Sequence, residues 1–131
     1  MRWLALALFL PAGALAEERR LTADEFEARV TGRTIVYAQE GQIWGREQYL
    51  SGRRVIWAFE GQECKPGIWW DEAEDLVCFS YEEGAAPICW WFYDRDGVLL
   101  ARAQGDPEGM PLAELDSAQG GMPCPGPWLG S

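Results

Sequence analysis

Short runs of apolar residues follow one another from Thr34 to Gln104, and polar turns that contain Gly, Asp, Pro or Ser separate them. The runs are rich in β-branched and aromatic side chains, which is typical of β-strands. We predict strands at residues 34–39, 42–50, 53–60, 67–71, 75–81, 87–94 and 98–104. Because the connections are of hairpin length, we expect a mainly β fold, an antiparallel meander of about seven to eight strands that forms a small barrel or a strongly bent sheet.

One short N-terminal helix precedes the strands, at about residues 23–31. Thr22 is placed to act as its N-cap, and Glu25 three residues later completes the sequence signature of a capping box. The apolar residues Phe26 and Val30 are four positions apart and therefore share one narrow face of the helix. That face is expected to dock on the rest of the domain.

Residues 1–16 have the features of a signal peptide. Arg2 precedes an apolar stretch at residues 3–10, and the segment ends in Ala14-Leu15-Ala16. The stretch is too short to span a bilayer, which needs about 20 apolar residues. We predict cleavage after Ala16 and, because Glu17 follows rather than cysteine, no lipid anchor. The alternative is a buried N-terminal helix or strand.

The remaining 115 of the 131 residues, 17–131, fit a single β domain. Loss of Arg2 with the signal peptide would change the formal net charge from −10 to −11. Such an acidic chain is not expected to bind nucleic acid, or a membrane after signal cleavage, because their phosphates attract basic surfaces. The charge permits a cationic partner, although solubility is its commoner role. We expect a monomer.

Four cysteines, Cys64, Cys78, Cys89 and Cys124, lie in the predicted mature chain. An even number in an exported chain indicates two disulfides, with three possible connectivities, and a periplasmic or secreted location. Zinc binding is disfavoured because the chain has no C-x-x-C motif and no histidine. Residues 105–131 form a tail rich in Gly and Pro with little periodicity, and a disulfide from Cys124 would tie it to the sheet.

Residues 75–94 form two strands across one turn, with a cysteine in each. If Cys78 bonds Cys89, alternation places six large residues on one face, which would be the core face. They are Val77, Phe79, Tyr81, Ile88, Trp90 and Phe92. Cys64 would then pair with Cys124 by elimination.

The opposite face of this hairpin carries Leu76, Trp91 and Tyr93. Trp91 and Tyr93, with one of Trp69 and Trp70, form a candidate patch for a ligand or a protein partner, because rigid aromatic residues dominate binding hot spots. The favoured alternative is that the helix, or the tail with Trp128, covers this face.

The sequence favours a protein that is not an enzyme and carries no cofactor or metal. The chain has no histidine, so the usual Ser and Cys triads are excluded. Two carboxylates could act on a sugar, but with 21 acidic residues a close pair is expected by chance. The candidates are Glu47, Glu60, Asp71, Glu72, Glu74 and Asp75. Asp94-Arg95-Asp96-Gly97 is similar to the start of a calcium loop, but a turn between strands is the ordinary interpretation.

Two stretches, EGQIWGREQYLSGRRVIWAF and GIWWDEAEDLVCFSYEEGAAPICWWFYDRDG, resemble small exported proteins of proteobacteria that are grouped as a domain of unknown function. The resemblance covers about residues 21–104. The matching positions are Trp44, Tyr49, Trp69 or Trp70, Cys78, Cys89 and Gly97. It implies a small periplasmic β fold with a Cys78–Cys89 bond and no particular activity. Cys64 and Cys124 are additions to that pattern.

The function expected from these features is that of a non-enzymatic binding protein in the periplasm or outside the cell. One alternative is an inhibitor of a cationic enzyme such as lysozyme, which the acidic charge favours. The other is a lipocalin-like carrier of a small apolar ligand, which seven tryptophans in the predicted mature chain favour.

Overall fold

Nine strands, one α-helix and two short 3₁₀ helices make up the part of the chain that the computed structural model describes, namely residue 5, residues 17–119, and residues 122 and 124. Apart from Ala5, the predicted signal peptide lies outside the described residues, and so does Trp128. The elements, in chain order, are β1 (Arg19–Arg20), α1 (Ala23–Val30), β2 (Arg33–Gln39), β3 (Gln42–Leu50), η1 (Ser51–Arg53), β4 (Arg54–Phe59), β5 (Lys65–Glu72), η2 (Ala73–Asp75), β6 (Leu76–Ser80), β7 (Ile88–Arg95), β8 (Val98–Ala103) and β9 (Leu112–Gln119).

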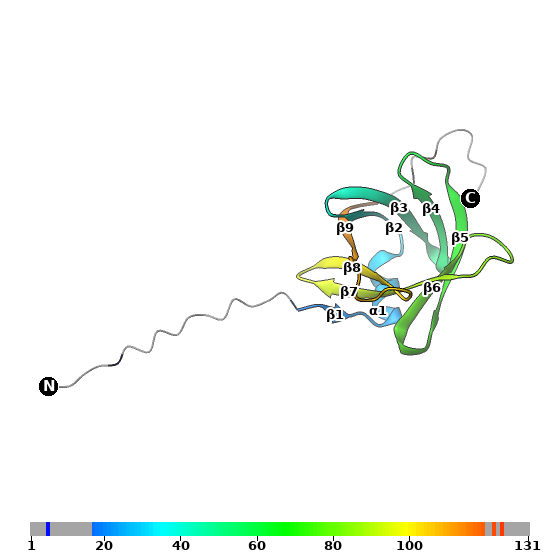
Figure 1. Ribbon diagram of the computed structural model, residues 1–131. Helices are drawn as coiled ribbons and strands as arrows, with labels where there is room; N and C mark the ends of the chain where they lie inside the picture. Colours follow the sequence, from blue (N-terminus) through cyan, green and yellow to red (C-terminus); the bar gives the residue numbers. More distant parts are fainter. Residues whose placement is uncertain (1–4, 6–16, 120–121, 123, 125–131) are drawn as a thin grey trace.

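Strands β2 to β9 form a closed antiparallel barrel. Each strand pairs with the next one along the chain, and β9 also pairs with β2, which closes the ring (Figure 1). β1 is an extra strand that pairs with β7 beyond the segment that pairs with β6. The predicted mainly β meander with a barrel form is therefore confirmed.

The strands predicted from the sequence end at residue 104, but residues 112–119, inside the Gly- and Pro-rich tail, form one more strand, β9. Four of its eight residues are polar and none is β-branched in its side chain or aromatic, so its composition does not look like a strand. Main-chain pairing with β2 and β8 holds it in place. The two-residue β1 was also not predicted, because it is too short for any alternation to show.

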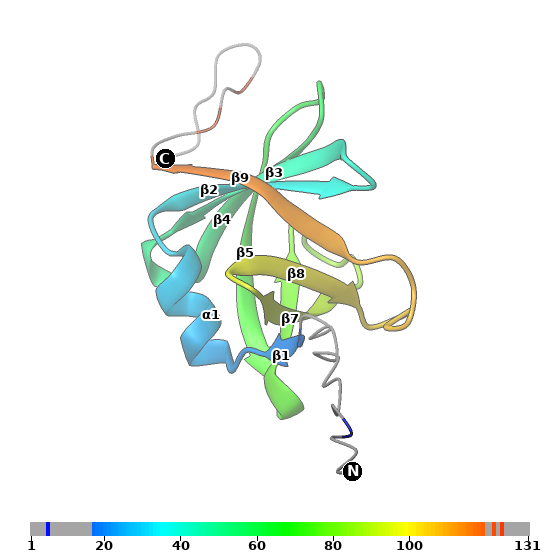
Figure 2. The same cartoon turned by 90° about the vertical axis from the view of Figure 1, so that its left-hand side faces the viewer.

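Helix α1 packs against one end of the barrel (Figure 2). The capping box is present: Thr22 accepts a hydrogen bond from the Glu25 amide, and the Glu25 carboxylate accepts one from the Thr22 amide. Phe26 and Val30 are fully buried, and the Phe26 ring lies 4.1 Å from that of Phe92 between ring centroids. The helix therefore fills the barrel end. The expectation that it covers the outer aromatic face of the β6–β7 hairpin is wrong, and the other expected cover, the tail with Trp128, lies outside the described residues.

Arg29 connects this helix to the barrel wall. Its guanidinium donates to Asp94 Oδ1 at 2.5 Å and to the Gly97 carbonyl at 2.5 Å, and lies 3.6 Å from Glu114 Oε1. Because the arginine side chain bridges α1, β7 and β9, the helix is held across the end of the barrel. Asp96 and Gly97 both have positive φ and form the tight turn between β7 and β8. The segment at residues 94–97, which is similar to the start of a calcium loop, is therefore the end of a strand and this turn.

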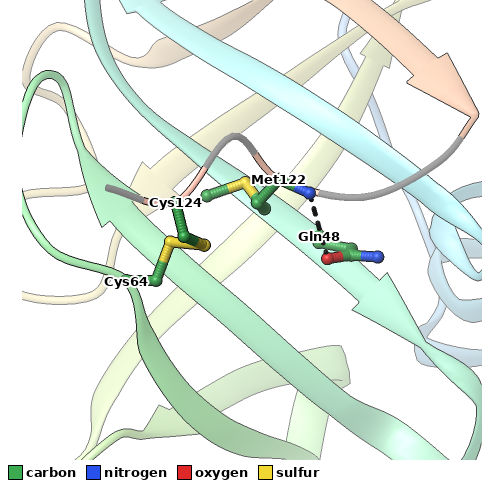
Figure 3. Close-up of a disulfide and its surroundings, with 4 residues drawn as sticks. All are labelled: Gln48, Cys64, Met122 and Cys124. Carbon is green, nitrogen blue, oxygen red and sulfur yellow. Dashed lines mark hydrogen bonds between the residues drawn. A yellow bond between two sulfur atoms is a disulfide. The ribbon is translucent and has the colours of Figure 1, made fainter. Parts of the chain in front are cut away.

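Both predicted disulfides are present. Cys78 and Cys89 face each other in the register of β6 and β7, and Cys64 is bonded to Cys124. The second bond brings the C-terminal segment against the outside of β3, where the Met122 amide donates to Gln48 Oε1 at 3.3 Å (Figure 3). Within the described residues, no helix has the length and apolar character needed to cross a membrane.

Candidate functional site

A pocket of about 210 Å³ occupies the barrel interior towards the end opposite α1. The loop residues that line it belong to the β6–β7 connection, and Lys65 begins β5. They are Tyr81, Glu82, Ala85 and Ala86. The turn between β2 and β3 and the loop between β8 and β9 lie at this same end, with α1 at the other (Figure 2). Nine lining residues are aromatic: Tyr37, Trp44, Tyr49, Trp57, Phe59, Phe79, Tyr81, Trp90 and Phe92.

Strand alternation and register bring these side chains inward. Glu47 of β3 lies opposite Trp57 of β4, and Trp57 lies opposite Lys65 of β5, so the three residues share the inner face. Trp44 comes inward for a different reason. It is the unpaired residue at a β-bulge in β3, between Ile43, which pairs with Ala38, and Gly45, which pairs with Tyr37. A bulge redirects the side chain that it carries.

Four rings surround the opening of the pocket. The Trp44 ring lies 5.4 Å from that of Trp57, 5.2 Å from that of Phe59 and 6.0 Å from that of Trp90, measured between centroids. These contacts are edge-to-face or tilted, the arrangement that aromatic quadrupoles favour. Trp44 and Phe59 are more than a third exposed, and Ile88 beside them is 53% exposed. Apolar surface left in water at the mouth of an apolar cavity is typical of a binding site.

Glu47 carries the buried carboxyl group of this pocket. It is only 2% exposed, and its Oε1 accepts a hydrogen bond of 2.5 Å from the Tyr81 hydroxyl. Its Oε2 is buried and has no hydrogen-bond partner. Burial raises the pKa of this carboxyl from 4.5 to about 8, against the opposing effect of the Tyr81 hydrogen bond. The carboxyl is therefore mainly protonated at neutral pH.

Two more tyrosines form the floor of the pocket. The hydroxyls of Tyr37 and Tyr49 lie 2.7 Å apart, within hydrogen-bond distance. Both side chains are buried, and burial raises the pKa of each phenol above its usual value. The two phenols are therefore neutral. Below them the interior is filled by Phe26 of the helix, which contacts the Tyr49 ring edge-on.

The predicted aromatic patch consists of Trp91 and Tyr93 with one of Trp69 and Trp70, and it is Trp70 that shares their outer face. Trp69 is buried in the core, where the Arg53 guanidinium lies 4.2 Å from its ring centroid. Trp70, Trp91 and Tyr93 lie on the outer face and are half-buried. Arg20 of β1 lies over both Trp91 and Tyr93, and the Trp91 indole donates to the Glu74 carbonyl at 3.1 Å. β1, rather than the helix, is therefore packed against this face.

The predicted core face of the β6–β7 hairpin is found with one correction. Val77, Phe79 and Phe92 belong to the core, and Tyr81 and Trp90 pack against it. Ile88 points the same way, but it lies at the pocket mouth and is exposed rather than buried. The six candidate carboxylates do not form one site either. Glu60 pairs with Arg46 and Asp71 with Arg53, and of the six only Glu47 lines the pocket.

Sequence reasoning included Glu47 among the acidic candidates but did not identify it as part of a pocket. Its position in β3 was the available signal. Glu47 is two residues from both Gly45 and Tyr49, so all three point to the same, inward face of the strand. The described residues contain no cluster of three or more His, Cys, Asp or Glu side chains suited to a metal ion. Comparisons with protein-family models, curated proteins and solved structures find no match.

Proposed function

We propose that this protein binds a small, mainly apolar molecule inside its barrel and acts as a carrier rather than as an enzyme. The observation that supports this function best is the interior pocket, whose walls consist largely of aromatic rings around one buried carboxyl. Ligand pockets commonly combine an apolar lining with a few polar groups, and the mouths of β-barrels are frequent places for them.

The size of the pocket limits the ligand. Pockets for drug-sized molecules measure about 300–1,000 Å³, and a cavity of about 150 Å³ holds benzene. At about 210 Å³, this pocket suits one aromatic ring with a short substituent. The proposed ligand is therefore fragment-sized, and smaller than a long-chain lipid.

The proposed location is the periplasm or the exterior of the cell. A predicted signal peptide and two disulfides support it, because disulfides persist in oxidising compartments. Membership of the exported proteobacterial family that the sequence resembles is part of the same proposal. We further propose that the protein acts as a monomer, since the ligand would be enclosed by one barrel.

Trp90 and Trp91 provide a matched test. They are neighbours in β7, both half-buried, but Trp90 lines the pocket and Trp91 lies on the outer face. We expect Trp90→Ala to weaken binding of small aromatic probes at least tenfold, measured by calorimetry, and Trp91→Ala to change it less than twofold. Native mass spectrometry of the protein purified from its own host should also reveal a bound small molecule.

The opposite result would favour a protein partner. Suppose that the captured partner is a protein, and that Trp91→Ala weakens its binding whereas Trp90→Ala does not. The outer aromatic face would then be the functional surface. The inhibitor hypothesis rests on the acidic net charge, and salt-sensitive binding to lysozyme would support it. The carrier function is ruled out if the wild type binds no probe and no small molecule is recovered with it.

A further inference from the structure

We propose that the ligand is a small primary or secondary amine, whose ammonium group pairs with the Glu47 carboxylate while its apolar body lies among the rings of the pocket. This inference rests on the proposed carrier function and specifies its ligand. It makes Glu47 the residue that determines specificity.

Glu47 has one oxygen to offer a ligand. Its Oε1 is engaged by the Tyr81 hydroxyl, but its buried Oε2 has no partner. A buried polar atom without a hydrogen bond is unfavourable, and natural proteins keep such atoms mainly where function requires them. A ligand that brings an N–H group to this oxygen would satisfy it.

The surrounding groups favour a positive charge on that ligand. The ionisable groups deep in the pocket with Glu47 are the phenols of Tyr37, Tyr49 and Tyr81, which are neutral. Lys65 and Glu82 line the mouth, where both are exposed. The nearest arginine in sequence, Arg46, alternates to the outer face of β3 and pairs with Glu60. Arg29 acts on Tyr37 from the helix end of the barrel, but it is paired with Asp94 and Glu114. No described cation contributes to the environment of Glu47 itself.

The aromatic walls add to this preference. The faces of Trp44, Trp57 and Trp90 carry negative electrostatic potential, which attracts a cation and repels an anion. The acidic net charge of −10 would also raise the local concentration of cationic ligands. Shape, charge and the free oxygen thus point to the same class of molecule.

Binding should be coupled to the release of one proton. The free carboxyl, with its pKa raised to about 8, is mainly protonated at neutral pH. When an ammonium ion binds, Glu47 loses its proton to the solvent and the ion pair forms, so net charge and protons balance. Affinity should therefore rise as the pH increases from 6 to 8, and fall once the free amine loses its own proton.

Three probes of nearly equal size test the charge preference: 2-phenylethylamine, 2-phenylethanol and phenylacetate. At pH 8.5, calorimetry on the wild type should give the amine at least tenfold higher affinity than the alcohol, with the carboxylate weakest. In Glu47→Gln the tenfold preference should disappear while the alcohol still binds. Near-UV circular dichroism verifies that the variant is folded, and Tyr81→Phe offers a second variant that disturbs the same carboxyl.

Glu83→Gln is the matched control, because Glu83 is an exposed carboxylate of the same β6–β7 loop that does not line this pocket. It should leave the amine preference within twofold of the wild type. If the alcohol or the carboxylate binds as tightly as the amine, the inference is wrong although the carrier function stands. It is equally wrong if Glu83→Gln abolishes the preference as fully as Glu47→Gln. If no probe binds, including a larger apolar dye, the carrier function itself fails.

Discussion

Gly45 faces the barrel interior directly against the indole of Trp57. A Cβ atom at this position would lie 2.4 Å from two carbons of that ring, so any other residue would displace it. Gly67 has the same relation to Tyr81, with the nearest ring carbon 2.6 Å from a Cβ. A glycine within a strand often marks a place where another group approaches the backbone closely. These two glycines therefore shape the pocket wall.

The carboxyl of Glu47 makes stability depend on pH in an unusual direction. Its folded pKa of about 8 lies above the value of 4.5 expected in the unfolded chain, because burial disfavours the charge. The folded state thus holds the proton more tightly, and stability falls as the pH rises from about 4.5 to 8. Each pKa unit corresponds to about 1.4 kcal/mol, so the total is on the order of a few kcal/mol.

Chemical denaturation at several pH values measures this effect. Between pH 5 and 9, the free energy of unfolding of Glu47→Gln minus that of the wild type should increase. Glu82→Gln, at the exposed pocket mouth, should follow the wild type in parallel. A constant difference between Glu47→Gln and the wild type would show that Glu47 keeps an ordinary acidity in the folded protein.

At the scale of single elements, Trp44 shows what strand alternation cannot predict. In a regular strand, alternation would place Trp44 on the face opposite Glu47 and Tyr49. Because β3 carries a bulge at this point, Trp44 instead lines the pocket with them. Whether a strand bulges depends on its neighbour's register, which is a tertiary property. The helix was predictable because its capping signals are local in sequence, whereas β9 depends on pairing with β2, more than seventy residues away.

The capping box of α1 yields a prediction about helix stability. Thr22→Ala removes the hydroxyl that accepts from the Glu25 amide at 3.1 Å, and loss of such a cap costs about 1 kcal/mol. Thermal unfolding followed by circular dichroism should show this loss.

Glu25→Gln is the companion variant for this test, because glutamine keeps an oxygen that can accept from the Thr22 amide. We expect it to be less destabilising than Thr22→Ala. Equal stability of Thr22→Ala and the wild type would mean that the barrel end positions the helix without its cap.

At the scale of the whole molecule, hairpin-length connections were enough to predict the antiparallel meander, because each short turn makes neighbouring strands pair antiparallel, but they left open whether the sheet closes into a barrel. The pocket was not predictable in the same way. Its lining comes from all eight barrel strands and a loop, and its volume is what remains after those side chains pack. The pocket volume therefore depends jointly on strand register, on the bulge at Trp44 and on the glycines at positions 45 and 67.

The two disulfides should stabilise the fold unequally. Cys78 and Cys89 are 11 residues apart, and Cys64 and Cys124 are 60 apart. In the chain-entropy model these bonds contribute about 3 and about 4 kcal/mol, because the longer loop restricts the unfolded chain more. Replacing Cys64 and Cys124 with alanine should therefore lower the free energy of unfolding by roughly 1 kcal/mol more than replacing Cys78 and Cys89.

Guanidinium denaturation of the two double variants checks this ranking, with the fully reduced wild type as the reference for loss of both bonds. A larger loss on replacing Cys78 and Cys89 would mean that packing of the buried Cys78 outweighs loop length.

Lys65 is the chain's only lysine, and it lines the mouth of the pocket. Apart from the α-amino group, an amine-reactive fluorophore would therefore attach at a single place, beside the opening through which a ligand would pass. Such a labelled protein would report occupancy of the barrel directly, without the overlapping emission of its many tryptophans. Coupling through Lys65 to a solid surface would fix the molecule with the pocket facing the support.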